Sequence, residues 1–202
     1  MTDKTVPFEI RPMEPGDVST VVAIDRLSFP TPWSASSYSY ELRHNKTSFY
    51  YVLLKPEADG DTPPQQPWHR FFKNGPEKGT QVIGYMGFRL RGPRAHISTI
   101  AVHPEWRGCG LGELLLLTAL EEALARGRSA VTLEVRASNR VAQHLYRKCG
   151  FRFTGIQEKY YRDGEDAWLM EMRADNRACR DRVSDLRAAL EARLYRQQSQ
   201  AP

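Results

Sequence analysis

The sequence predicts a mixed α/β domain in which helices flank a central sheet. Three observations support this class. Segments rich in β-branched and aromatic residues alternate with segments of helical periodicity along most of the chain, as in α/β domains. Near the middle, a glycine-rich turn joins a strand to a long apolar helix. Two later strands, 151–161 and 166–173, surround a turn at 162–165, which predicts a closing hairpin.

Length and composition fit one folded domain with a sizeable core. The chain has 202 residues, 41% of them hydrophobic, and a formal net charge of +5. That charge is too mild to choose among nucleic acid, a ribosome and a phosphorylated cofactor as partners. Because no zinc-finger spacing or RNA-binding signature accompanies it, we expect no direct nucleic-acid binding.

Cysteine usage and hydropathy indicate a reducing compartment. The cysteines Cys109, Cys149 and Cys179 are an odd number without metal-ligand spacing, which favours free thiols and predicts no metal site. No apolar run approaches the length of a membrane span, and no signal peptide is visible. We therefore expect a cytoplasmic protein without membrane contact, acting as a monomer.

The N-terminal part predicts two strands and two helices. Residues 8–13 alternate apolar and polar side chains, which predicts a first strand. A helix should begin after Pro15, with Asp17 as its cap and one apolar face. That face comprises Val18, Val21, Val22, Ile24 and Leu27. Ser34 can cap a second short helix, and the aromatic and β-branched stretch 49–55 predicts another strand.

Residues 56–79 differ in composition from their surroundings. Five of the chain's 13 prolines fall here, among acidic, glutamine and glycine residues, which predicts an inserted flexible loop. Trp68, Phe71 and Phe72 lie inside it. They dock on the domain or face a partner, and docking is favoured because exposed aromatic patches are uncommon.

The stretch 97–124 organises the rest of the chain. A strand ends near Val102, since Pro104 cannot donate to a ladder, and glycines then alternate at 108, 110 and 112 before a leucine-rich helix. The first helical N–H groups have no intrahelical partner and suit an anion such as a pyrophosphate, beside the charge of Arg107. Glu113 breaks the dinucleotide pattern, and no P-loop lysine follows. A tight turn without any ligand is the alternative.

The C-terminal half continues the alternation. Strands are expected at 81–90, 95–102 and 130–135, with a helix ending near Gly127 between the last two. Asn139 opens a further helix that Gly150 ends. Beyond residue 173 the pattern is helical again, and this tail packs on the domain or on a partner. Its apolar stripe comprises Val183, Leu186, Leu190 and Leu194.

Several stretches together resemble the GCN5-related N-acetyltransferase (GNAT) superfamily. The pattern Arg107-x-x-Gly110-x-Gly112 is similar to its acyl-CoA pyrophosphate loop, and residues 145–151 match its Leu-Tyr-x-x-x-Gly-Phe signature. Within the superfamily the chain resembles the RimI-type ribosomal-protein alanine N-acetyltransferases. The carriers are Phe29, Pro32-Trp33-Ser34, residues 133–139, Tyr160-Tyr161, Glu165-Asp166-Ala167 and Met170.

The resemblance covers roughly residues 8–173 and implies the GNAT fold, a mixed but mostly antiparallel sheet flanked by helices. It divides the chain into an acetyltransferase domain at 1–173, with the insertion, and a helical tail at 174–202. It implies acetyl-CoA as co-substrate, with no metal. It further implies direct acetyl transfer to a protein N-terminal amine, the alanine of a small-subunit ribosomal protein. A lysine or small-amine acetyltransferase and a non-catalytic CoA-binding or ribosome-associated module are the alternatives.

The resemblance also implies how the cofactor is held. Backbone N–H groups of Arg107, Gly108, Cys109, Gly110, Leu111 and Gly112 would bind its pyrophosphate. Backbone groups of Ile100, Ala101 and Val102 would meet the pantetheine arm and the thioester oxygen, although their sequence equally suits a core. Asn139 is a helix cap, a cofactor contact, or both.

Two residues are candidates for proton transfer. Glu134 interrupts an apolar strand, where a carboxylate is costly unless it is paired or used, so it is the candidate base. The alternative is a salt bridge, for instance to Arg136 or Arg162. Tyr146 is the candidate acid that protonates the leaving thiolate; the alternative is a core aromatic with a hydrogen-bonded hydroxyl.

The peptide site is predicted from aromatic residues. Trp33, Tyr160 and Tyr161 could wall an N-terminal peptide, and Glu165 or Asp166 could attract a basic one. Ordinary packing and turn formation are the alternatives for this whole group. His96 and His103 are expected to be solvated structural residues at strand ends.

Overall fold

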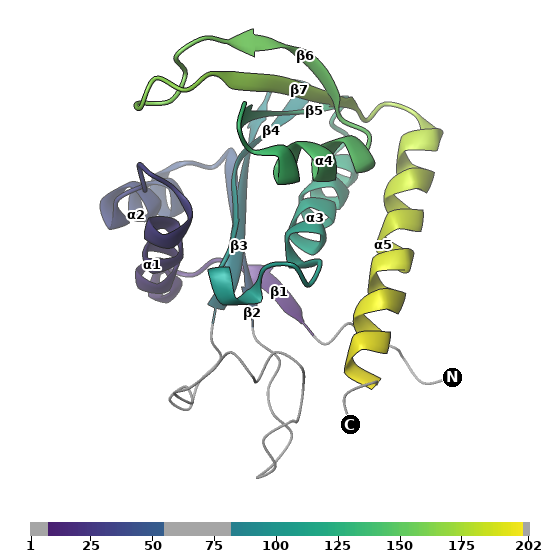
Figure 1. Cartoon of the computed structure of the whole chain (residues 1–202), viewed down its shortest axis with the longest axis horizontal. Coiled ribbons are helices and arrows are strands. Elements are labelled where there is room, and N and C mark those ends of the chain that lie inside the picture. The colour runs from purple at the N-terminus through teal and green to yellow at the C-terminus, as the bar shows by residue number, and fades with distance from the viewer. Residues whose placement is uncertain (1–7, 55–81, 200–202) are drawn as a thin grey trace.

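The computed structural model describes residues 8–54 and 82–199, and within them one seven-stranded sheet with helices on both faces (Figure 1). The predicted insertion at 56–79, with its three aromatics, lies outside the described residues. The strands are β1 (Glu9–Pro12), β2 (Ser48–Leu54), β3 (Val82–Arg91), β4 (Arg94–Val102), β5 (Ala130–Arg136), β6 (Arg152–Gln157) and β7 (Ala167–Arg173). The helices are η1 (Pro15–Asp17), α1 (Val18–Ser28), α2 (Ala35–His44), η3 (Pro104–Trp106), α3 (Leu111–Ala125), α4 (Arg140–Lys148) and α5 (Arg177–Ser199).

The strand order is β1-β2-β3-β4-β5-β7-β6, and every neighbouring pair is antiparallel except β4 with β5. The parallel pair is short. Its register runs from Arg94 opposite Ala130 to Ile97 opposite Leu133 and contains no later pair. Beyond Ile97, β4 continues against β3 alone, and β5 continues against β7 alone. The two parallel strands therefore part halfway along the sheet, which leaves an unpaired backbone edge on each.

Two apolar clusters fill the two faces of the sheet. The larger lies against α3 and α5, and the smaller lies against α1 and α2 (Figure 1). Helix α3 is apolar nearly all round, and four successive leucines, 114–117, are all buried. A helix with this pattern needs a partner on each side. The sheet covers one side, and α5 covers the other.

The C-terminal helix therefore packs on the domain, as one of the two predicted options. Val183, Leu190 and Leu194 are buried in the larger cluster, and Leu186 packs against it. The boundary drawn at residue 173 stays a prediction. The contact between α3 and α5 nevertheless makes the helix part of the main core.

Two local predictions in α1 are wrong. Asp17 stands at the N-cap position of α1 but its side chain makes no cap hydrogen bond there; its carboxylate accepts the Glu14 N–H at 2.8 Å, in a capping box of η1, and pairs with Arg11 at 2.7 Å. Leu27 is 55% exposed. Asp25, and not Leu27, continues the buried face of α1, and Leu27 lies outside that face. The Ser34 cap is confirmed, since its hydroxyl accepts the Ser37 N–H at 3.1 Å.

The last hairpin is shorter than predicted. β6 ends at Gln157 rather than near residue 161. Lys159 has a φ of 49°, a left-handed conformation that a regular strand does not contain. The chain from there to β7 is a turn, so Tyr160 and Tyr161 belong to a loop and not to a strand.

Candidate active site

The turn between β4 and α3 offers a row of free amides. Gly108 and Gly110 have φ values of 81° and 89°, left-handed conformations that favour glycine. Leu114 is the first residue of α3 whose N–H donates within this region, to the Gly110 carbonyl at 3.0 Å. The N–H groups of residues 108–113 have no hydrogen-bond partner within the described parts of the chain. Six consecutive free donors at a helix start can bind an anion.

Arg107 makes its hydrogen bonds within the chain, and its predicted cofactor contact stays a prediction. Its guanidinium donates to the Val102 carbonyl and to the Ser28 hydroxyl, each at 2.9 Å. Its backbone N–H donates to the Pro104 carbonyl at 3.2 Å. The side chain thus ties the turn to β4 and to the end of α1. The free amides begin one residue later than the sequence predicted.

Glu134 lies on β5 beside His96 of β4. Its Oε2 is 3.2 Å from His96 Nε2, and the other ring nitrogen of His96 is 3.1 Å from the Thr132 hydroxyl. Burial raises the pKa of Glu134, but the hydrogen bond and charge of His96 outweigh it, with help from Tyr160 and Arg91. The net effect is a pKa below the usual value, so the carboxylate is ionised at neutral pH.

The partner of Glu134 was not predicted. His96 was expected to be solvated, yet it is only 9% exposed, and that prediction is wrong. The short parallel register places His96 opposite Thr132, on the same face as Glu134. Arg136 instead pairs with Asp163 and Glu165, at 2.8 and 2.6 Å. A polar residue inside the apolar run of β4 was the one sequence signal for His96.

Tyrosines from the β6–β7 turn complete this centre. The Tyr160 hydroxyl donates to Glu134 Oε2 at 3.4 Å, and the Tyr160 and Tyr161 rings meet edge to face at 5.0 Å. Arg136 lies over the Tyr161 ring at 4.0 Å. Burial raises the pKa of Tyr161, Arg136 opposes it, and the charges of Tyr160, Tyr146 and Glu134 add to it. Glu134, Tyr146, Tyr160 and Tyr161 are therefore near neighbours.

Tyr146 projects from α4 and is partly buried against the larger cluster, with its ring 5.8 Å from Phe151. Its hydroxyl forms no hydrogen bond with any residue that the structure describes. Burial, and then the neighbouring Cys149, raise the pKa of Tyr146 to about 12. Asn139 caps α4 by accepting the Ala142 N–H at 3.1 Å, so the cap option is confirmed; its cofactor contact stays a prediction.

The remaining predicted peptide residues lie apart or are engaged. Trp33 is exposed in the α1–α2 connection, where its backbone N–H donates to the buried Asp25 carboxylate at 2.6 Å. This connection and the β6–β7 turn lie on the same side of the molecule (Figure 1). Glu165 accepts the Ser138 N–H from the β5–α4 connection, and Asp166 accepts the Lys159 N–H within the β6–β7 turn, each at 2.8 Å. The Ser138 hydrogen bonds, followed by Arg136, lower the pKa of Glu165 to about 2.

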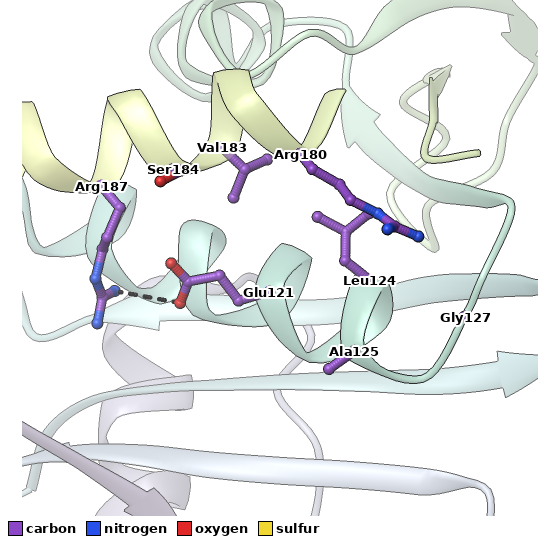
Figure 2. A pocket seen from close by; sticks show the side chains of 8 residues that line it. All are labelled: Glu121, Leu124, Ala125, Gly127, Arg180, Val183, Ser184 and Arg187. Atoms are coloured by element: carbon purple, nitrogen blue, oxygen red, sulfur yellow. Dashed lines mark ion pairs between the residues drawn. The ribbon is translucent and has the colours of Figure 1, made fainter. Parts of the chain in front are cut away.

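A cavity of about 670 Å³ lies elsewhere, between α3 and α5. Figure 2 shows Glu121 of α3 and Arg187 of α5 facing each other there, 3.9 Å apart. None of its lining residues is a predicted site residue. Among the described residues no group of His, Cys, Asp and Glu side chains could hold a metal ion. No described helix has the length and apolar content needed to cross a bilayer.

The fold and this centre define a class: an α/β domain in which a turn with free backbone amides follows one of two parting parallel strands and a carboxylate lies on the other. The chain belongs to the acetyltransferase (GNAT) family, whose model matches residues 20–151. It adopts the GNAT fold, and the predicted resemblance to the RimI type is confirmed by the relatives that follow.

Three relatives illustrate this placement. A putative [ribosomal protein bS18]-alanine N-acetyltransferase of Bacillus subtilis is 35% identical over 162 residues, covering 80% of this chain and 92% of that protein. The N-alpha-acetyltransferase RimI of Mycobacterium tuberculosis is 30% identical over 84% of this chain and 95% of its own. The solved ribosomal-protein-S18-alanine N-acetyltransferase of Escherichia coli superposes with a TM-score of 0.65, at 25% identity over 84% and 95% of the two chains.

Proposed function

We propose that this protein transfers an acetyl group from acetyl-CoA to the N-terminal amine of a protein, the alanine of a small-subunit ribosomal protein. The observation that carries the chemistry is the parting of β4 from β5, with the free amides of residues 108–113 after one strand and Glu134 on the other. The similarity to bS18-alanine and RimI-type enzymes supports the choice of substrate. We place the enzyme in the cytoplasm as a monomer.

The cofactor fits the parted strands. Free N–H groups of the turn, Gly108 to Gly112, bind its diphosphate. Ile100, Ala101 and Val102 lie past the last β4–β5 pair, so their backbone has no strand partner on that side and could meet the pantetheine arm, except for the Val102 carbonyl, which accepts from Arg107. Asn139 and Tyr146, on the helix after β5, lie along the same route. A thioester held there would lie beside β5, the strand that carries Glu134.

Proton transfer is divided between two side chains. The attacking amine has an ordinary pKa near ~8 and must lose a proton, which Glu134 accepts directly or through water as the N–C bond forms. The C–S bond then breaks and leaves a thiolate. Tyr146 keeps its proton at neutral pH, because its pKa is raised, and its hydroxyl can therefore donate to that thiolate. His96 orients Glu134 and holds it ionised.

Trp33, Tyr160 and Tyr161 line the approach for the peptide in this proposal. The test is acetyl-CoA consumption against peptides that differ only in their first residues, beside the same peptides with blocked lysines. Consumption should require a free N-terminal amine, follow the first residue and favour alanine. Equal turnover of a peptide with a blocked N-terminus and free lysine would identify a lysine acetyltransferase instead. CoA binding without turnover of any amine would identify a non-catalytic module.

A further inference from the structure

A buried carboxylate lies beside the free amides, between two cations from other helices. Glu113, in the first turn of α3, has a side chain only 7% exposed. It pairs with Lys148 at the end of α4 and with Arg193 of α5, whose Nη2 is 3.1 Å from Glu113 Oε2. We call Glu113, Lys148 and Arg193 the Glu113 cluster. It joins three helices at the anion-binding turn.

Arg193 lies directly against the turn. A Cβ placed on Gly110 would be 2.6 Å from Arg193 Nη2 and 3.1 Å from a methyl group of Leu190, also on α5. Leu190 and Leu194 are buried in the larger cluster, so this part of α5 is fixed against α3. Figure 1 shows α5 running alongside α3. The guanidinium is therefore held at the turn by the core packing of its own helix.

The charges favour a ligand at this point. The guanidinium of Arg107, whose charge was expected beside the anion, is engaged with Val102 and Ser28. An anionic cofactor therefore needs another cation, all the more because Glu113 is negative. Two cations and one anion leave the Glu113 cluster with one net positive charge. The Arg193 side chain is 42% exposed, and Glu113 takes only part of its five N–H donors.

We propose that α5 completes the cofactor site and that Arg193 binds a phosphate group of CoA. This inference rests on the proposed function, because it assumes that CoA binds at residues 108–113. Arg193 lies beyond the segment matched by the family model, which ends at residue 151. The tail helix is then both a support for α3 and a contributor to cofactor affinity. Lys148 supplies a second cation to the same phosphates.

The test is calorimetric titration of CoA into the full-length protein and into Arg193→Met. We expect affinity to fall about tenfold or more, the usual effect of losing a charge-assisted hydrogen bond. Arg193→Lys should recover part of the loss. Arg180→Met is the matched control. It removes the same charge from the same helix, beside the cavity near Gly127 at the far end of α3 (Figure 2), and should bind CoA as the wild type does.

Glu113→Gln separates direct contact from structural support. If Arg193 touches phosphate, removing the carboxylate frees the guanidinium and removes a negative charge, so CoA affinity should stay equal or rise. If Arg193 only braces the turn through Glu113, both variants should weaken binding alike, which would overturn the proposal. Titration of dephospho-CoA identifies the phosphate. If Arg193→Met also lowers the affinity for dephospho-CoA, Arg193 contacts the diphosphate. If it lowers the affinity for CoA alone, Arg193 contacts the 3′-phosphate.

The two proposals fail in different ways. Absence of CoA binding by the wild type would remove the proposed function together with this inference. Normal binding by the wild type, with an unchanged or tighter affinity in Arg193→Met, would overturn only the inference. Melting temperatures of all variants, measured without ligand, show whether a loss of affinity accompanies a loss of folding. If Arg193→Met is less stable than the wild type, the CoA affinity of Arg193→Lys is compared instead, because this variant keeps a positive charge at the same position of α5.

Discussion

Two opposing influences act on the charge of Glu134. Burial favours the neutral acid, whereas His96 and Tyr160 favour the carboxylate, and the second influence is the stronger. A base must be ionised to accept a proton, so activity should fall as the pH falls through this pKa. The amine, with its pKa near ~8, is mostly protonated at mildly acidic pH. Glu134→Gln should therefore lower activity most at mildly acidic pH.

His96→Gln tests this arrangement by its pH profile. The substitution removes the ring contact with Glu134 but leaves Glu134 half-buried, so the pKa of the carboxylate should rise. The acidic limb of kcat/KM should then move to higher pH, while activity at high pH changes less. His103→Gln is the control, since His103 lies after the other end of β4, 3.7 Å from Glu105. A profile unchanged in both variants would show that His96 does not govern the base.

Tyr146→Phe should separate catalysis from binding. The ring packs against Phe151, and phenylalanine preserves that contact. CoA affinity should therefore remain within about twofold of the wild type, and the melting temperature should remain within a few degrees. The proton donor is lost, which should lower kcat by roughly 10²-fold. Single-turnover rates and CoA titration measure the two effects. Equal losses in rate and affinity would assign Tyr146 to cofactor binding rather than to proton transfer.

Helix α5 contributes to the main core although it lies at the C-terminal end of the sequence. Leu190 is 2% exposed, against 55% for Leu27 on α1, so the two leucines form a matched pair. Leu190→Ala should lower the free energy of unfolding by about 2–4 kcal/mol because it leaves a cavity between α5 and α3. Leu27→Ala should change it by about 0.5 kcal/mol or less. Urea unfolding of both variants compares them, and similar small effects would mean that α5 does not support α3.

The same elements show what the sequence could and could not predict. Local patterns are sufficient for the strands other than the end of β6, for the glycine turn and for the Ser34 and Asn139 caps, because each depends on residues close in the chain. His96 and Glu134 are 38 positions apart in the numbering and meet only through the β4–β5 register. The hydrogen bond from the Arg107 guanidinium to the Ser28 hydroxyl likewise joins residues that are far apart in the sequence. Periodicity in one segment carries no information on such pairs.

At the scale of the molecule, the sheet separates two tasks. The face carrying α3 and α5 holds the turn with free amides at 108–113 and the Glu113 cluster. The face carrying α1 and α2 holds the Trp33 connection and the carboxylate of Glu134, whose neighbours Leu133 and Val135 point into the larger cluster. The parting of β4 from β5 is the point at which the two faces communicate. In the proposed function, the phosphates of acetyl-CoA would therefore bind on one face of the sheet, and the amine would approach the thioester from the other.

This separation predicts the effect of deleting residues 56–79, which join β2 to β3. Leu54 and Val82 are antiparallel register partners, so a short turn of Asn-Gly type can connect them directly. CoA affinity should remain within about threefold of the wild type, because every predicted cofactor group lies after residue 99. Preference among peptides, or stability, should change, since the segment joins β2 to β3 and no predicted cofactor residue lies in it. Loss of CoA binding in a variant that still melts cooperatively would show that the segment reaches the cofactor, and the assignment of tasks to the two faces would then be wrong.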